Sequence, residues 1–158
     1  MSNVYGVIAN ASYYGTLANK QTNGVVDARV KAMLDYYNTT GSEGTNQSVL
    51  MHPTLPVGAK IVGQRLTFSA NLTPGVLVHV GDLVCATRYI ISAPVTAAVA
   101  YDMFTTTYGV PNSSQYVIGT TDTNASSTDK QIVVTLGNAT NNTQAGTIIK
   151  LTTLYTMD

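Results

Sequence analysis

The sequence predicts an all-β protein, built as an antiparallel sandwich or barrel. Only 10% of the 158 residues are charged. The composition is rich instead in Thr, Val, Ile and Tyr, which favour strands over helices. No convincing amphipathic helix links the segments. About eight or nine β-like segments follow one another roughly 8–12 residues apart, joined by polar turns, and this spacing is typical of antiparallel sandwiches and barrels.

The central stretch, residues 59–82, shows the strand pattern most clearly. From residue 62 to residue 72 apolar side chains alternate with polar ones, the pattern of a strand with one buried and one solvated face. Pro74-Gly75 then interrupts the run with a strong turn signal, and the alternation resumes from Val76 to Val80. We therefore expect a β-hairpin with a short loop near the middle of the chain.

The segment 25–37 fits two structures. As a helix it would place Val26, Val30 and Met33 on one stripe. As a strand it alternates from residue 26 to residue 36, with Leu34 and Tyr36 on the apolar face and the charged residues on the other. We interpret it as a strand, because the alternation is long and no helix C-cap is evident.

Further strands are expected on both sides of these segments, at residues 48–52, 84–93, 115–120, 131–136 and 147–156. Pro94 should end the strand at 84–93 or mark an edge. Residues 97–104 fit either a strand or a single helical turn. The side chains that we expect in the core are Leu66, Phe68, Leu72, Val78, Ile132, Val134, Ile149 and Leu151.

The first 24 residues show no clear period and hold three tyrosines among Asn, Ala, Gly and Thr. We expect residues 1–24 to form an extended N-terminal arm and residues 25–158 to form the sandwich domain. Tyrosines in a polar arm indicate docking, because exposed aromatic rings are poorly suited to water. The arm can dock on a partner or on its own domain, and both alternatives remain open. Its candidate anchors are Val4, Tyr5, Val7, Ile8, Tyr13 and Tyr14.

Charge and hydropathy exclude several kinds of partner. With 8 basic and 8 acidic residues the formal net charge is zero, which gives no electrostatic attraction to nucleic acid or an anionic membrane. No stretch approaches the roughly 20 apolar residues of a membrane span, and the N-terminus lacks a secretory signal. We therefore expect synthesis and use in the cytoplasm of the producing cell. A near-neutral chain also tends to self-associate, which favours work within an assembly.

The residues that carry chemistry are few and scattered. His52, His79 and Cys85 show no metal-binding spacing, and we expect Cys85 to be a small buried hydrophobe. Glu43, the only glutamate, lies in a Gly/Ser/Thr loop and is expected to be solvated. No nucleophile motif or phosphate-binding loop is present. We expect no catalytic residue, no metal and no cofactor.

Asp82 and Arg88 form one candidate pair in the run VGDLVCATRYI. The acid directly follows a predicted strand and the arginine lies on the next one. Across a short connection the two side chains can form an ion pair that fixes the register, and we favour this structural role over a functional site.

The stretch LPVGAKIVGQRLTFSANLTPGVLVHVGD and the following ATRYIISA resemble a family of small virion proteins of tailed bacteriophages. The matching motifs are Leu55-Pro56-Val57-Gly58-Ala59, Val80-Gly81-Asp82 and Arg88-Tyr89-Ile90, and the similarity covers roughly residues 25–158. The resemblance implies a jelly-roll-like β-sandwich without catalytic residues. At Leu83-Val84-Cys85 the chain departs from the family pattern, which has a polar, Asp-rich turn there.

The resemblance also implies a role. It is that of a capsid decoration (cement) protein, whose partners are the major capsid protein of an HK97-like shell and neighbouring copies of the chain. Such a protein is made in the host cytoplasm and lies on the capsid surface of the virion. The alternative is a tail- or fibre-associated sandwich that binds host-surface carbohydrate, because Tyr and Asn in loops suit sugar contacts equally well.

Overall fold

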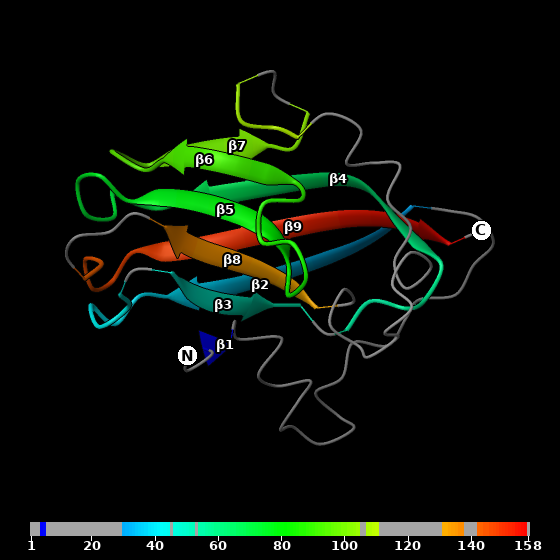
Figure 1. Cartoon of the computed structure of the whole chain (residues 1–158), viewed down its shortest axis with the longest axis horizontal. Coiled ribbons are helices and arrows are strands. Elements are labelled where there is room, and N and C mark those ends of the chain that lie inside the picture. The colour runs from blue at the N-terminus through cyan, green and yellow to red at the C-terminus, as the bar shows by residue number, and fades with distance from the viewer. Residues whose placement is uncertain are drawn as a thin grey trace.

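The computed structural model describes residues 4–5, 30–44, 46–52, 54–104, 107–110, 131–137 and 142–157. Within these ranges the chain forms nine strands and no helix. The strands make two sheets that pack face to face, so the predicted all-β sandwich is confirmed (Figure 1). Among the described residues no helix is long and apolar enough to cross a membrane.

One sheet has five strands and the other has four. The five-stranded sheet contains, in spatial order, β1 (Val4–Tyr5), β3 (Gln47–Met51), β8 (Ile132–Gly137), β5 (Leu77–Asp82) and β6 (Ile90–Pro94). The four-stranded sheet contains β2 (Lys31–Asn38), β9 (Ile148–Met157), β4 (Ala59–Phe68) and β7 (Val99–Asp102). All pairs are antiparallel except β1 and β3, which run parallel.

The connections alternate between the sheets. From β2 to β9 the chain crosses to the opposite sheet at every step except the one from β5 to β6. Each sheet is therefore built from strands distant in sequence, such as β2 against β9 and β3 against β8. The jelly-roll-like connectivity that the resemblance implied stays a prediction.

The predicted central hairpin is wrong. Its two strands exist as β4 and β5, but they lie in different sheets. The turn is present, since the Val76 amide donates to the Thr73 carbonyl at 3.1 Å and Gly75 has a φ of 85°. Leu72 and Val76 are both only 1% exposed, so the loop is anchored in the core while it crosses between the sheets. A period of two identifies a buried face but does not say which sheet the strand joins.

Within the strand expected at residues 25–37, residues 31–37 belong to β2 with their faces reversed, and residues 25–29 lie outside the described residues. Leu34 is 54% exposed and Tyr36 is 42% exposed, whereas Met33 and Asp35 face the core. Asp35 is accommodated because its carboxylate accepts the amide of Tyr36 at 2.8 Å and the amide of His52 at 2.9 Å. A buried carboxylate with such donors avoids the full cost of desolvation.

Two other segments also differ from expectation. The strand predicted at 84–93 is shorter, because residues 83–89 form a loop and β6 begins at Ile90. Residues 97–104 contain the strand β7 and no helical turn. The strand expected at 115–120 lies outside the described residues.

The core prediction is confirmed. All eight side chains that we expected in the core are at most 4% exposed. They belong to one cluster between the sheets, together with larger side chains such as Tyr89, Tyr155 and Met51. The inner faces of both sheets are therefore filled, and any binding surface of the described domain lies on an outer face or in the loops.

Candidate functional site

The outer faces of the two sheets are unlike each other. On β8, Ile132 and Val134 face the core, so the alternating Val133 and Thr135 face outward. Val133 is nevertheless only 1% exposed and Thr135 only 8% exposed. The outer face of the four-stranded sheet, in contrast, is open to solvent and carries apolar side chains. The open face is therefore the better candidate for contact with a partner.

Strand register brings the apolar side chains of this face together. Leu154 on β9 lies opposite Ala32 on β2 and Gly63 on β4. One step along the same face, Thr152 lies opposite Leu34 and Arg65. The face is thus assembled from strands far apart in sequence.

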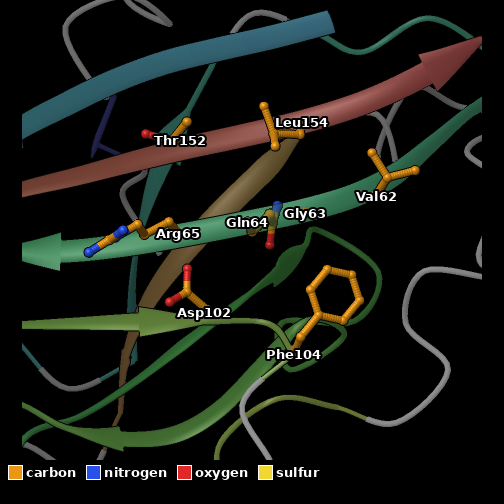
Figure 2. A pocket seen from close by; sticks show the side chains of 8 residues that line it. All are labelled: Val62, Gly63, Gln64, Arg65, Asp102, Phe104, Thr152 and Leu154. Carbon is orange, nitrogen blue, oxygen red and sulfur yellow. The ribbon is translucent and has the colours of Figure 1, made fainter. Parts of the chain in front are cut away.

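A groove of about 320 Å³ runs over this face. Its floor is at Gly63, next to the irregularity in register between Ile61 and Gly63. Figure 2 shows the side chain of Leu154 on one side of Gly63 and the ring of Phe104 on the other. The lining residues are Val62, Gly63, Gln64, Arg65, Asp102, Phe104, Thr152 and Leu154.

The groove is deep at Gly63 because this residue has no side chain. A Cβ atom at Gly63 would come within 3.4 Å of Leu154 Cδ1 and would fill the floor. Phe104 is 63% exposed and Leu154 is 37% exposed, so much apolar surface stays in water. Arg65 and Asp102, opposite each other on β4 and β7, give the groove a polar end. This combination suits an apolar side chain of a protein partner.

Sequence reasoning missed the groove, although two signals were present. In the run TIIKLTTLYT the apolar Leu154 follows Lys150 and Thr152 on the less buried face of its strand. Gly63 likewise interrupts a long amphipathic strand, and glycine within a strand often marks a bulge or a close approach. What the sequence did not provide is the register that places these residues beside Phe104.

Of the residues expected from the sequence to form a structural pair, Asp82 and Arg88 are in direct contact. The Arg88 Nε atom donates to the Asp82 carboxylate, which is buried. The other carboxylate oxygen accepts the amides of Val84 at 2.9 Å and Cys85 at 2.7 Å. Cys85, expected to be buried, is instead partly exposed and is a free thiol. The pair therefore holds the loop between β5 and β6.

Of the candidate arm anchors, two are placed. Val4 and Tyr5 form β1, whose backbone pairs in parallel with Val49 and Leu50 of β3. Here the arm contacts its own domain, one of the two alternatives left open. Val7, Ile8, Tyr13 and Tyr14 lie outside the described residues, so docking of the arm on a partner stays a prediction.

Glu43 is buried, contrary to the expectation that it is solvated. Its carboxylate accepts hydrogen bonds from the Tyr37 hydroxyl at 2.5 Å, from the Thr40 amide at 2.8 Å and from the Thr143 hydroxyl. Burial would raise the pKa of Glu43, but the hydrogen bonds from Thr143, Tyr37 and Thr40 outweigh it and lower the pKa to about 2. Burial, together with the nearby Glu43 charge, raises the pKa of Tyr37. The cluster joins the loop after β2 to the loop before β9.

A second polar cluster lies between the sheets. His52 Nε2 lies 2.9 Å from the Thr153 hydroxyl, and Asp35 accepts the backbone amide of His52. Asp35, His52 and Thr153 are residue types that occur in catalytic sites. Each of them is 0% exposed here, so no substrate can reach them. Burial lowers the pKa of His52 to about 3 and keeps the ring neutral. Within the described ranges, no cluster of at least three His, Cys, Asp or Glu side chains is arranged to hold a metal ion.

The fold and the open apolar face define a β-sandwich suited to contact with other proteins. No known family model matches the sequence, and no curated protein matches it either. Two solved structures are similar to it in fold. One is a chain of the cyanophage Pam1 capsid asymmetric unit, with 19% identity and a TM-score of 0.57, over 87% of this chain and 95% of that one. The other is a chain of the capsid of Ralstonia phage GP4, with 14% identity and a TM-score of 0.59, over 87% and 92% of the two chains. This chain shares their fold.

Proposed function

We propose that this chain is a non-enzymatic structural protein of a bacteriophage particle. Within the particle we assign it the role of a capsid decoration (cement) protein. It binds the major capsid protein of an HK97-like shell, contacts neighbouring copies of itself and lies on the capsid surface after synthesis in the host cytoplasm. It uses no nucleic acid or membrane as a partner.

The observation that carries the proposal is the likeness in fold to two phage capsid chains, which covers 87% of this chain. The alignments cover 95% and 92% of those chains. The likeness therefore extends over nearly all of each capsid chain and is not confined to one domain of a larger protein.

The surface chemistry supports the same role. A net charge of zero gives the protein no overall long-range attraction to a charged partner, which favours binding through shape and apolar contact. The groove and the exposed Leu34, Tyr36 and Leu154 around it supply such contact on the open sheet face. We therefore propose this face as a contact surface for the shell. Many weak contacts repeated over a shell give strong attachment by avidity.

The experiment that tests the proposal uses whole particles, head and tail, of the phage that encodes the chain, grown without it. Purified protein is added, and electron microscopy with a labelled antibody locates it. We expect label over the whole head and added density on the shell surface. Label confined to the tail tip would contradict the decoration role and favour the carbohydrate-binding alternative. Bovine serum albumin, added at the same concentration, controls for non-specific adsorption.

A further inference from the structure

The connection between β5 and β6 presents two adjacent apolar side chains to solvent. Leu83 is 42% exposed and Val84 is 51% exposed. We refer to Leu83 and Val84 as the apolar tip. Solvent-exposed connections are commonly polar, and two neighbouring aliphatic side chains at such a place need a reason.

The backbone that carries the tip is held by a set of polar contacts at its base. Asp82 Oδ1 accepts the amides of Val84 and Cys85, and Asp82 Oδ2 pairs with Arg88. The Cys85 carbonyl in turn accepts the amides of Asp82 at 3.1 Å and Arg88 at 3.2 Å. The Tyr89 amide then donates to the Val80 carbonyl at 2.9 Å. The loop is thus fixed at both of its ends and in the middle.

Gly81 lets the loop fold tightly onto the strand. A Cβ atom there would lie 2.0 Å from the Cys85 carbonyl oxygen and 2.4 Å from the Ala86 carbonyl carbon. Only glycine permits this approach. The Val-Gly-Asp run therefore supports the loop in two ways: Gly81 packs against the loop backbone, and Asp82 accepts hydrogen bonds from its amides.

The tip lies at the more apolar end of the sandwich. β4 begins at the end where β5 finishes (Figure 1), and Val57, just before β4, is 53% exposed. At the opposite end, the described parts of the loops around residues 39–46, 69–76, 95–98 and 142–147 expose no large apolar side chain. The described domain therefore has one polar end and one end that carries exposed aliphatic groups.

Charge narrows the class of partner. The loop reads Leu-Val-Cys-Ala-Thr from residue 83 to residue 87, without a charged side chain, and Arg88 is paired with Asp82. Phosphate-bearing partners such as nucleic acid or anionic lipid need free basic groups, which this loop does not offer. An apolar hollow on a protein matches the chemistry of the tip.

We propose that the apolar tip is a preorganised anchor that inserts Leu83 and Val84 into an apolar hollow of the capsid shell protein, beside the contacts made by the open sheet face. This inference rests on the proposed function and adds to it a second contact element and an orientation, with the tip-bearing end toward the shell. The loop is already held in one shape, so binding costs little conformational entropy. More of the free energy gained by burying apolar surface therefore contributes to affinity.

The test compares two double variants for binding to heads grown without the chain. L83S/V84S makes the tip polar, and A97S/A98S makes the same number of changes at an exposed pair of the polar end. Co-sedimentation with heads over a range of concentrations gives the affinities, and circular dichroism and thermal melts verify that both variants fold. We expect L83S/V84S to bind heads at least about tenfold more weakly than the wild type, which corresponds to the loss of a single good contact. The A97S/A98S variant should bind like the wild type.

A third variant tests preorganisation. Arg88→Gln removes the ion pair and leaves the tip residues in place. We expect its binding to fall between that of the wild type and that of L83S/V84S, with increased protease cleavage in the loop. Full binding by Arg88→Gln together with unchanged protease resistance would overturn the claim of a held loop.

The remaining outcomes separate this inference from the proposed function. If the wild type binds heads and L83S/V84S binds them equally well, the tip is not an anchor, while the decoration role stands. If the wild type does not bind heads at all, both fail. If L83S/V84S binds heads normally but loses self-association in sedimentation velocity, the occupant is a second copy and the assignment to the shell is overturned.

Discussion

The carbonyl oxygen of Cys85 lies only 2.0 Å from the position that a Cβ atom on Gly81 would take. No side chain can be placed there unless the backbone of the loop moves away from β5. Movement of the loop would also break the hydrogen bonds that Asp82 accepts from Val84 and Cys85. The close approach of Gly81 and Cys85 is therefore a requirement for the shape of the connection between β5 and β6.

We accordingly expect Gly81→Ala to destabilise the protein by about 3 kcal/mol, at the upper end of the usual cost of overpacking. Urea unfolding followed by circular dichroism measures the change. Gly44→Ala is the matched control, because the nearest atom to its added Cβ is Asn142 Oδ1 at 4.0 Å. An equal effect of the two substitutions would show that the loop yields at little cost.

Glu43 should make stability depend on pH in the acid range. Its pKa in the folded protein is lowered to about 2 from an ordinary value of 4.5. The unfolded chain therefore takes up a proton first, and the stabilisation present above pH 4.5 is lost as the pH falls toward 2. Glu43→Gln should cost about 1.5–3 kcal/mol at neutral pH, the value of hydrogen bonds to a charged group.

Urea unfolding at several pH values between 2 and 7 measures this effect. Glu43→Gln should flatten the dependence below pH 4.5. Thr143→Val, which removes one donor to the carboxylate, should shift the loss of stability to higher pH. A Glu43→Gln variant with the same acid dependence as the wild type would exclude Glu43 as its source.

His52 should act in a higher pH window. Burial lowers its pKa to about 3 from 6.5, so the folded protein keeps the ring neutral while the unfolded chain binds a proton below pH 6.5. Stability is therefore complete above pH 6.5 and falls as the pH drops toward 3. His52→Gln keeps an amide within reach of Thr153 and should flatten the dependence between pH 6.5 and 4.5, above the range of Glu43.

His79 needs a separate control, because partial burial also lowers its pKa. His79→Gln should remove the smaller contribution of this less buried ring. Thermal melts of both variants at pH 7, 6 and 5 cover the window above the range of Glu43. If the melting temperature of His52→Gln falls with pH as steeply as that of the wild type, protonation of His52 is not the cause.

The groove on the open sheet face should matter for binding and little for folding. Leu154 points into water and is 37% exposed, so Leu154→Ser should change the free energy of unfolding by only about 0.5 kcal/mol. It should weaken binding to undecorated heads, because it removes one apolar wall. Ala100→Ser, on the same outer face at β7, is the control. Head binding unaffected by Leu154→Ser would remove the groove from the proposed interface.

The sequence pattern predicted buried faces well and long-range relationships poorly. Phe68 and Val134 were placed in the core because a period of two reports burial directly. Pro74-Gly75 was correctly recognised as a turn, but whether a turn closes a hairpin or crosses between sheets depends on partners distant in sequence. The faces of β2 were predicted the wrong way round because of Asp35. Its charge indicated a solvent-exposed position, but its carboxylate is buried and accepts hydrogen bonds from backbone amides.

The candidate sites show the same division. Asp82 and Arg88 are six residues apart, and local reasoning was enough to pair them. The groove needs the register of β4 against both β9 and β7, which no local pattern contains. The burial of Glu43 depends on Thr143, one hundred residues away. Local chemistry is thus readable in the sequence, while surfaces assembled across strands are not.

The N-terminal arm gives the last prediction. Protein lacking residues 1–24 should fold, because every member of the core cluster lies at residue 33 or later and only the short β1 is lost. It should fail to bind undecorated heads. An arm rich in Asn, Gly, Ala and Thr cannot by itself offset about 1–2 kcal/mol of backbone entropy per residue. Its anchors Tyr5, Tyr13 and Tyr14 can each return about 1.5–3 kcal/mol when a partner buries them.

A thermal melt and a head-binding assay on the truncated protein decide between the two positions of the arm. An unchanged melting temperature with lost binding means that the arm docks on the shell. A lowered melting temperature with retained binding means that the arm serves its own domain, as the pairing of Val4 and Tyr5 with β3 indicates, because truncation then uncovers the edge of β3. The full-length variant with Ser at Tyr5, Tyr13 and Tyr14 keeps the backbone of β1. It should reproduce the loss of binding only if the rings themselves are the anchors.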